Sequence, residues 1–385
     1  MSPGTRIYAD YNATAPLRPE AKAAMVRALE MTGNPSSVHG EGRKARALVE
    51  GTREAVAAAI GACRDDIAFT SGGTEAVGAV LRGALQAMGD SRSVASAIEH
   101  DAVTSLVSGK DAWPVLASGV VDLDWLRDET PKIAKQGHRP LVSLMLVNNE
   151  TGVIQAVAEA AEIVHAAGGL IHCDAIQALG KITTSIIDLD VDYLSVSAHK
   201  IGGPQGVGAF YVKPGAPFKA VQTGGGQEFG RRAGTENVAG IAGFGAAVDA
   251  AEAGLAGYQA LGVARDRMEA IMKSAAPSLQ VHGECAPRVA GVSCFGVEGL
   301  PSETQIMGLD LAGFAVSAGS ACSSGKVKPS RVLTAMGLND TAARSAIRAS
   351  FGWASTPEDF DALANAWIRM AARARPQLVK LDAHV

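Results

Sequence analysis

The stretch LVSLMLVNNE at residues 141–150 runs apolar for the length of a strand and then turns polar at Asn148 and Asn149. A continuous apolar run is typical of a strand that is buried on both faces, as in a parallel sheet. Similar short runs lie at residues 67–70, 94–97, 170–173, 193–196 and 207–212, and Ala-rich helical stretches such as 156–167 separate them. This alternation predicts an α/β fold with a large, doubly wound, mostly parallel sheet.

The last third of the chain has a different order of elements, which predicts a second, smaller domain. Beyond Gly257 the pattern indicates a helix at residues 261–274, strands near 279–282 and 289–295, a helix from Ser302, a strand near 314–317 and a final helix at 357–373. Such an order is typical of an α+β unit. We therefore expect a large domain over residues 16–256, a small domain over 257–385, and a segment over 1–15 that packs on the small domain.

Composition excludes several classes of partner. The chain has 385 residues and a net charge of −4, which gives no electrostatic reason to expect nucleic acid or an anionic membrane surface. No apolar stretch approaches the ~18 residues that span a bilayer, and the first residues lack the pattern of a secretory signal. Five cysteines, an odd number, suit a reducing compartment with free thiols better than a disulfide framework. The expectation is a soluble cytoplasmic protein.

Polar side chains follow the predicted strands at the positions where a ligand site is expected. In open α/β sheets, ligands bind beyond the carboxyl ends of the strands. The polar groups that follow these strands are Ser71-Gly72-Gly73-Thr74, Glu99-His100, Asn148-Asn149, Asp174 with Gln177, and Ser197 to Lys200. Because these strand ends meet at one edge of the sheet, we expect a single shared site.

Three of these groups indicate a common cofactor. Gly73 and Thr74 at a helix start can bind a phosphate, although a plain helix cap accounts for them as well. Asp174 can pair with a protonated ring nitrogen or simply cap the next turn. Lys200, after a buried strand, can act as a nucleophilic amine or extend out of the site. Together, the anion cup, the acid and the lysine predict pyridoxal phosphate binding.

Cys322 lies in the stretch SAGSACSSG at residues 317–325, where small residues predict an accessible loop. Lys326 and Lys328 follow it and favour the reactive thiolate, although a cysteine in such a loop can also be incidental. The other cysteines are expected to be structural: Cys173 and Cys294 in apolar strands, and Cys63 and Cys285 near turns. No pair has zinc-site spacing, so no metal site is predicted in the protein core.

At this point, motifs along nearly the whole chain resemble those of one family. They are residues 9–15 (ADYNATA), 34–39 (NPSSVH), 69–75 (FTSGGTE), 99–100 (EH), 147–152 (VNNETG), 172–177 (HCDAIQ), 197–203 (SAHKIGG), 224–236 (GGGQEFGRRAGTE), 317–324 (SAGSACSS) and 345–352 (SAIRASFG). On these motifs the chain resembles the cysteine desulfurases of the NifS/IscS group. These belong to the class V aminotransferase family, on the fold-type I scaffold of pyridoxal phosphate enzymes.

The resemblance implies a role for each residue around the cofactor ring. Lys200 would hold the cofactor covalently, His100 would stack on its ring and shuttle protons, and Asp174 would pair with the ring nitrogen. Gln177 and Asn149 would hydrogen-bond the ring oxygen. Lys200, His100 and Cys322 would be the catalytic residues.

The resemblance also implies how the phosphate is held. Its ligands in one subunit would be Gly73, Thr74, Ser197 and His199. Thr235, in the polar loop over residues 224–236, would complete the cup from the other subunit of a homodimer.

For the substrate, the resemblance implies that Arg348, with Asn149, holds the carboxylate of L-cysteine. The thiolate of Cys322 would take up the substrate sulfur as a persulfide, and the remainder would leave as L-alanine. The sulfur would then pass to an iron–sulfur scaffold or another acceptor protein. This serves iron–sulfur cluster assembly, including the nitrogenase type, or thiolation, and Cys322 could ligate a cluster transiently.

Two other enzymes of the same scaffold remain as alternatives: a selenocysteine lyase and a related class V aminotransferase. An aminotransferase has no need of Cys322, so the role of that residue discriminates. The chain also departs from the family pattern at Val77 and Gly78, where polar residues are common, and at Phe229, where Arg is common. We expect the first departure to alter contacts near the phosphate and the second to affect acceptor docking.

Overall fold

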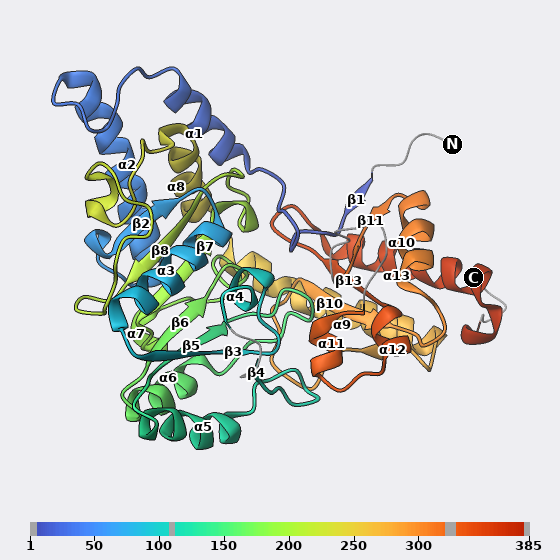
Figure 1. Cartoon of the computed structure of the whole chain (residues 1–385). Coiled ribbons are helices and arrows are strands. Elements are labelled where there is room, and N and C mark those ends of the chain that lie inside the picture. Colours follow the sequence, from blue (N-terminus) through green and yellow to red (C-terminus); the bar gives the residue numbers. More distant parts are fainter. Residues whose placement is uncertain (1–5, 108–111, 320–328, 381–385) are drawn as a thin grey trace.

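The computed structural model describes residues 6–107, 112–319 and 329–380. Within these ranges, seven strands form one large sheet in the order β2-β8-β7-β6-β5-β3-β4 (Figure 1). The strands are β2 (Ile67–Thr70), β3 (Ser91–Ser96), β4 (Ala112–Trp113), β5 (Arg139–Met145), β6 (Leu170–Asp174), β7 (Tyr193–Ser197) and β8 (Gly208–Val212). Neighbouring strands are parallel except that β8 runs antiparallel to both β2 and β7. The predicted mostly parallel sheet is confirmed.

Helices cover both faces of this sheet because successive strand residues point to opposite sides. Leu141 and Leu170 pack with the helix α3 (Gly73–Met88), whereas Val142 and Ile171 pack in the core that includes the helix α6 (Val157–Ala166). Both sets are fully or almost fully buried. Since both faces of the central strands are covered by helices, a site open to a ligand lies at their carboxyl ends.

A layer of long helices lies beside β2, the edge strand of the large sheet. It contains α1 (Pro19–Leu29), α2 (Gly40–Ile60) and α8 (Val238–Ala253), which pack side by side (Figure 1). After α8 the chain turns by 61° into α9 (Leu255–Ala275). No single helix in the described part of the chain has the length and apolarity to cross a membrane, although this bent pair meets both criteria together.

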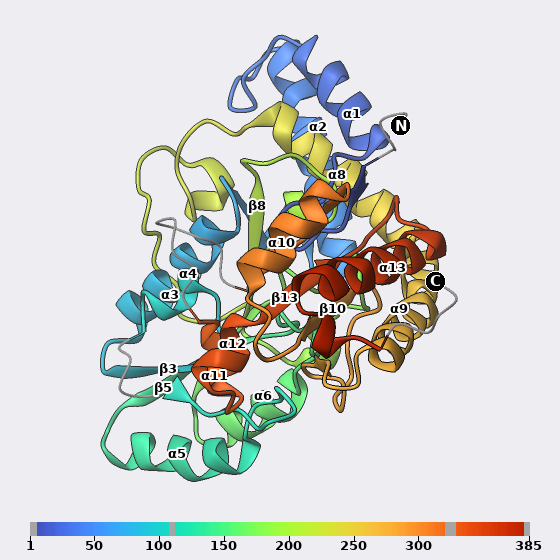
Figure 2. The same ribbon diagram turned by 90° about the vertical axis from the view of Figure 1, so that its right-hand side faces the viewer.

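A smaller antiparallel sheet follows in the last third of the chain, in the order β12-β13-β10-β9. Its strands are β9 (Gln280–Val281), β10 (Val292–Gly296), β12 (Ser317–Ala318) and β13 (Ala346–Ser350). The helices α10 (Ser302–Leu311) and α13 (Pro357–Ala374) lie across it, as Figure 2 shows from that side. Trp367 of α13 packs edge-on against Phe295 of β10.

The amino-terminal segment lies against the last third of the chain and forms a separate two-stranded parallel sheet there. Its strand β1 (Ile7–Tyr8) pairs with β11 (Phe314–Ala315), and Asp10 forms a bridge with Ser350. The chain then runs past the carboxyl ends of the large sheet, which brings residues 10–14 close to the predicted site. The domain boundaries at residues 15 and 256 stay predictions.

The sequence analysis left several helices out. They are α1, α2 and α5 (Leu123–Lys135), and the short α4 (Asp101–Thr104), α7 (Ile186–Leu189), α11 (Arg331–Ala335) and α12 (Asp340–Arg344). The single turns η1 (Arg64–Asp66), η2 (Ala198–Lys200), η3 (Gln227–Gly230) and η4 (Pro376–Leu378) complete the set. The predicted α/β class with a smaller α+β part is confirmed.

Candidate active site

A cavity of about 710 Å³ lies at the carboxyl ends of β5, β6 and β7, facing the smaller sheet. The predicted site residues that line it are Gly73, Thr74, His100, Asn149, Asp174, Gln177, Ser197, His199, Lys200 and Arg348. The structure therefore brings ten residues from separate motifs to one place. Cys322 lies outside the described residues, and Gly319 and Pro329 on either side of it line this cavity. Thr235 is exposed and is not among the lining residues.

Lys200 lies in the turn η2, directly after the buried strand β7. Its Nζ donates hydrogen bonds to the main-chain oxygens of Asn12 at 2.7 Å and Ala13 at 2.9 Å. Burial, followed by the nearby charge of Arg348, lowers the pKa of Lys200 to about 8. Roughly a tenth of this amine is therefore unprotonated at pH 7, and this free form can act as a nucleophile or base.

Asp174 ends β6, and Glu99 lies close to it in the same cavity. The Asp174 Oδ1 accepts a hydrogen bond of 2.9 Å from the main-chain N–H of Ile176, and burial raises the pKa of this carboxyl. A cationic ring nitrogen beside Asp174 would reverse that shift, because an opposite charge favours the carboxylate. Asp174 is thus placed to receive a cation.

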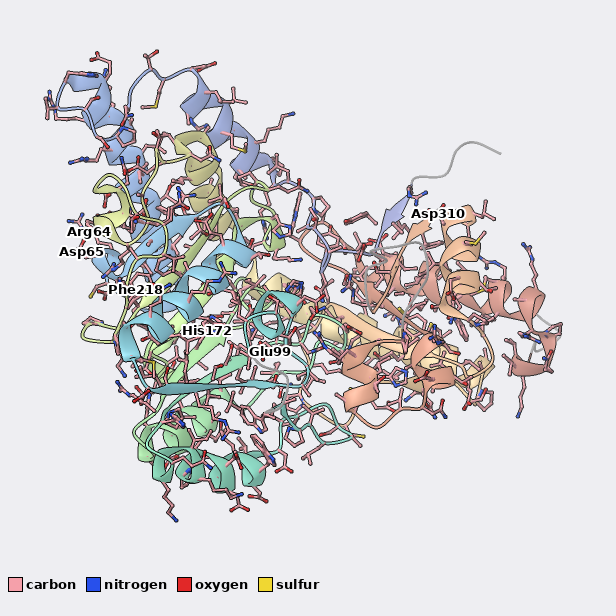
Figure 3. The ribbon with its side chains drawn as sticks, viewed as in Figure 1. Arg64, Asp65, Glu99, His172, Phe218 and Asp310 are labelled. Carbon is pink, nitrogen blue, oxygen red and sulfur yellow. The ribbon has the colours of Figure 1, made fainter. Side chains whose placement is uncertain are left out.

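Glu99 is 1% exposed and sits where the large sheet meets the smaller one (Figure 3). Its Oε1 accepts hydrogen bonds of 2.7 Å from both Ser96 Oγ and the main-chain N–H of Met145. Its Oε2 is buried and has no partner among the described residues. Burial, and then the charge of Asp174, raise the pKa of Glu99 to about 8, so the group is mainly neutral at pH 7. Burial thus raises the pKa of both acids of the site, Asp174 and Glu99.

His100 caps the amino terminus of α4 and faces the cavity. Its Nδ1 accepts a hydrogen bond of 3.1 Å from the main-chain N–H of Ala102, which orients the ring. This bond places the ring proton on Nε2, the atom left to interact with a ligand. His100 is therefore a fixed imidazole rather than a mobile one.

His172 forms a buried polar link under Asp174, within β6 (Figure 3). Its Nδ1 lies 2.8 Å from Ser143 Oγ and its Nε2 lies 3.0 Å from Ser195 Oγ. Burial lowers the pKa of His172 to about 3, so the ring is neutral. This link ties three neighbouring strands together beneath the site.

The start of α3 forms an anion cup beside the main cavity. A hollow of about 270 Å³ there is lined by residues 71–75, Ser197 and His199, among others. No side chain caps this helix, so its first N–H groups point into the hollow. The hydroxyl of Ser197 is buried and lacks a partner among the residues described. A Cβ at Gly73 would lie 2.5 Å from Ile176 Cδ1, so glycine keeps the cup open. These features fit the phosphate of pyridoxal phosphate.

Arg348 reaches the cavity from β13 in the smaller sheet. Its Nη1 donates to the main-chain oxygen of Asn149 at 3.0 Å, and its Nη2 pairs with Asp10 Oδ1 at 2.7 Å. Its Nε is buried and unpartnered among the described residues. The guanidinium thus keeps donor capacity for a carboxylate, although one edge is already engaged by Asp10.

The sequence analysis missed Asn12, which connects four parts of the site. This residue is 2% exposed. Its main-chain oxygen accepts from Lys200 and from Gln177 Nε2 at 2.9 Å, and its Nδ2 donates to Asn149 O at 3.0 Å. Asn12 lies in the ADYNATA stretch that carries the resemblance, but nothing in the spacing indicated these contacts.

A second lysine, Lys181, was also missed. Its Nζ donates to Asn12 Oδ1 at 2.8 Å and to Gln177 Oε1 at 2.6 Å. Burial, and then repulsion from Lys200 and Arg348, lower the pKa of Lys181 well below its usual value. Both ends of the Gln177 amide are therefore engaged, Oε1 by Lys181 and Nε2 by the main-chain oxygen of Asn12, which leaves the second N–H of Nε2 to donate to a ring oxygen.

The loop over residues 224–236 is anchored within its own chain. The buried Glu228 receives Arg53 Nη1 at 2.5 Å and Nη2 at 3.2 Å, and the main-chain N–H of Phe69 at 2.8 Å. Glu228 and Phe229 both have left-handed backbones, with φ of 51° and 55°. Phe229 covers Arg53 with its ring and is 53% exposed.

Two of the departures from the family pattern lie on α3. Val77 is fully buried in the core under the sheet, and neither Val77 nor Gly78 lines the cavities described above. Val77 and Gly78 can therefore change the phosphate contacts only by shifting the position of α3.

The four described cysteines follow the predicted division. Cys173 and Cys294 are buried in β6 and β10, and burial raises the pKa of both thiols. Cys63 and Cys285 are exposed. None of these four lines the main cavity.

Comparisons with known proteins agree with this geometry. The family model described as aminotransferase class-V matches residues 7–363. The chain is 42% identical to a cysteine desulfurase from Cereibacter sphaeroides over 93% of this chain and 94% of the relative, and 38% identical to one from Klebsiella pneumoniae over 92% and 90%. The crystal structure of a NifS-like protein from Rickettsia africae superimposes with a TM-score of 0.85 at 30% identity, covering 95% of this chain and 99% of that one.

Proposed function

We propose, since the chain belongs to the class-V aminotransferase family, that it is a cysteine desulfurase dependent on pyridoxal phosphate. It converts L-cysteine to L-alanine and takes up the sulfur as a persulfide on Cys322. The observation that carries this proposal is the convergence of Lys200, Asp174 and the α3 cup on one cavity that the segments flanking Cys322 also line.

The residues of the site suit the cofactor. Lys200 would hold it covalently, Asp174 would pair with the ring nitrogen, and the α3 cup with Ser197 would hold the phosphate. When bound, the cofactor supplies an electron-withdrawing ring that stabilises negative charge at the substrate Cα. A cationic ring nitrogen about 4 Å from Asp174 would interact with the carboxylate by about 4 kcal/mol at an effective dielectric of about 20.

The protein side chains orient the substrate and move its protons. Arg348 binds the carboxylate, assisted by Asn149. Lys200, with its pKa lowered to about 8, is placed to accept the Cα proton as a free amine. His100, whose Nδ1 is held by the chain, offers Nε2 for proton transfer. The Cys322 thiolate attacks the sulfur of the substrate and becomes the persulfide, while the carbon skeleton keeps the electron pair of the broken C–S bond.

The partners and the compartment are also part of the proposal. An acceptor protein takes the persulfide sulfur, for iron–sulfur cluster assembly or thiolation. Two copies of the chain form a homodimer in which Thr235 of one subunit completes the phosphate cup of the other; a fully active monomer by light scattering would contradict this. The four described cysteines are free thiols, which supports the cytoplasm as the site of action.

A single experiment tests the function. Purified enzyme with bound cofactor receives L-cysteine without added thiol, and alanine is measured. We expect a burst of one alanine per site and one extra sulfur on Cys322 by mass spectrometry. Amino-group transfer to an α-keto acid without persulfide would instead favour the related aminotransferase, and activity confined to L-selenocysteine would favour the lyase.

A further inference from the structure

A second cavity, here called the rear cavity, also has Lys200 in its wall. This rear cavity has a volume of about 310 Å³ and shares only Lys200 with the larger cavity. Its walls come from the amino-terminal segment, the start of α9 and the turn after β13, and include Arg18, Lys181, Tyr258 and Trp353. Its volume is at the low end of the range for ligand pockets, which suits a small molecule.

The basic side chains around the rear cavity have no acidic counterpart among its described lining residues, and Arg18 is the permanent cation among them, since burial lowers the pKa of Lys181 and Lys200. Arg18, Lys181 and Lys200 line it, and none of the lining residues that the structure describes is Asp or Glu. In the ranges 6–107, 112–319 and 329–380, neither Arg18 nor Lys181 has a carboxylate within ion-pair distance. Burying cations without a counter-charge is unfavourable, so this arrangement leaves room for an anion.

Arg18 is held so that part of its guanidinium stays available. Its Nε donates to Ile201 O at 2.8 Å and its Nη1 to Ala250 O at 3.3 Å. The guanidinium carbon lies 5.2 Å from the centre of the Trp353 ring. Nη2 has no hydrogen-bond partner in the described part of the chain, and burial lowers the pKa of Arg18.

The start of α9 adds main-chain N–H donors at the same place, where the last carbonyl groups of α8 also meet Gly254 and oppose the positive end of the α9 dipole. The helix α9 is 21 residues long, and no side chain caps its amino terminus. Gly254 and Gly257 at this end line the rear cavity, and a Cβ at Gly257 would meet nothing within 4 Å. The first N–H groups of the helix are thus accessible beside Arg18 and Lys181, as an anion requires.

We propose that the rear cavity binds a small organic carboxylate, of about amino-acid size, between Arg18, Lys181 and the amino terminus of α9. The site is separate from the main cavity and does not depend on the proposed function. A bound anion favours the protonated amine of Lys181, so binding takes up a proton. The other groups that face this amine are Asn12 and Gln177, as hydrogen-bond acceptors, and Lys200 and Arg348, as charges.

The test uses the enzyme with its cofactor bound, so that the phosphate cup is filled, and malonate as the probe. Fluorescence of Trp353 reports binding, and the Trp353→Phe variant identifies its part of the signal. We expect a saturable change that Arg18→Gln weakens at least about tenfold, since a charge-assisted hydrogen bond is lost. Arg27→Gln, an exposed arginine on α1, is the matched control and should bind as the wild type does.

Two further measurements distinguish the rear cavity from the main one. Malonate bound to Arg348, the residue proposed for the substrate carboxylate, would lie in the main cavity. Titration of Arg348→Gln with malonate should therefore leave the fluorescence change of Trp353 intact. Calorimetry in two buffers of different ionisation enthalpy should show that malonate binding takes up protons. The Lys181→Met variant should take up fewer protons than the wild type. The proposal is overturned if chloride at equal ionic strength gives the same change, if Arg18→Gln binds normally, or if the signal disappears in Arg348→Gln. If inorganic phosphate binds and malonate does not, the ligand is not a carboxylate and the proposal is overturned.

Discussion

The amine of Lys200 is held at 2.7 Å by the main-chain oxygen of Asn12, a residue 188 positions earlier in the chain. The side chain of the same asparagine receives Lys181 at 2.8 Å. One residue of the amino-terminal segment thus positions two buried amines, and the chemistry of the site depends on a segment outside the large sheet.

Lys200→Ala should remove covalent attachment of the cofactor and abolish turnover while the protein still folds. Borohydride reduction followed by peptide mapping should label Lys200 in the wild type and no lysine in the variant. Lys181 is the informative control, since it is the other buried amine near the site. A label on Lys181 would show that the assignment is wrong.

Cys322→Ser should keep binding of pyridoxal phosphate and L-cysteine but lose alanine release. A hydroxyl is a far poorer nucleophile toward sulfur than a thiolate, so kcat should fall more than binding. Mass spectrometry of the wild type should find the extra sulfur on Cys322. Cys63→Ser and Cys285→Ser, which change exposed thiols, should retain full activity.

Glu99→Gln should flatten the pH dependence of stability. The folded pKa of Glu99 is raised from 4.5 to about 8, so between these values the folded state binds more protons than the unfolded state. Wild-type stability therefore loses the contribution of this group as pH rises from about 5 to 8, and the isosteric amide removes that loss. Urea unfolding at pH 5.5, 7 and 8.5 measures the difference. Parallel curves for the two proteins would show that Glu99 is ionised throughout.

Gly73→Ala should weaken cofactor binding by at least about tenfold, because its methyl group would lie 2.5 Å from Ile176 Cδ1 and 3.3 Å from Ser197 Cβ. Gly78→Ala, on the same helix, is the matched control, since a Cβ there meets nothing within 4 Å. It should bind the cofactor normally and stabilise the helix by about 1 kcal/mol. Equal affinities in the two variants would mean that the cup does not need glycine at residue 73.

The sequence predicted those parts of the site that follow a strand. The positions of Asp174 and Lys200 could be predicted because each follows a buried apolar strand. The carboxyl ends of parallel strands meet at one edge of the sheet, so both residues were expected there. Asn12 and Lys181 could not, because their roles depend on how a distant segment crosses the sheet. The helix α1 was missed because its buried face consists of alanines, which give weak periodicity, and α2 was missed because Gly42, Thr52 and Arg53 interrupt its buried apolar face.

The ion pair between Arg53 and Glu228 has a consequence for assembly. It fixes two consecutive left-handed residues of the loop over 224–236 against β2, using contacts from one chain alone. In the homodimer that we propose, this loop would reach the partner already in its final shape. Association would then not have to order the segment that carries Thr235, and less conformational entropy would be lost when the two subunits meet.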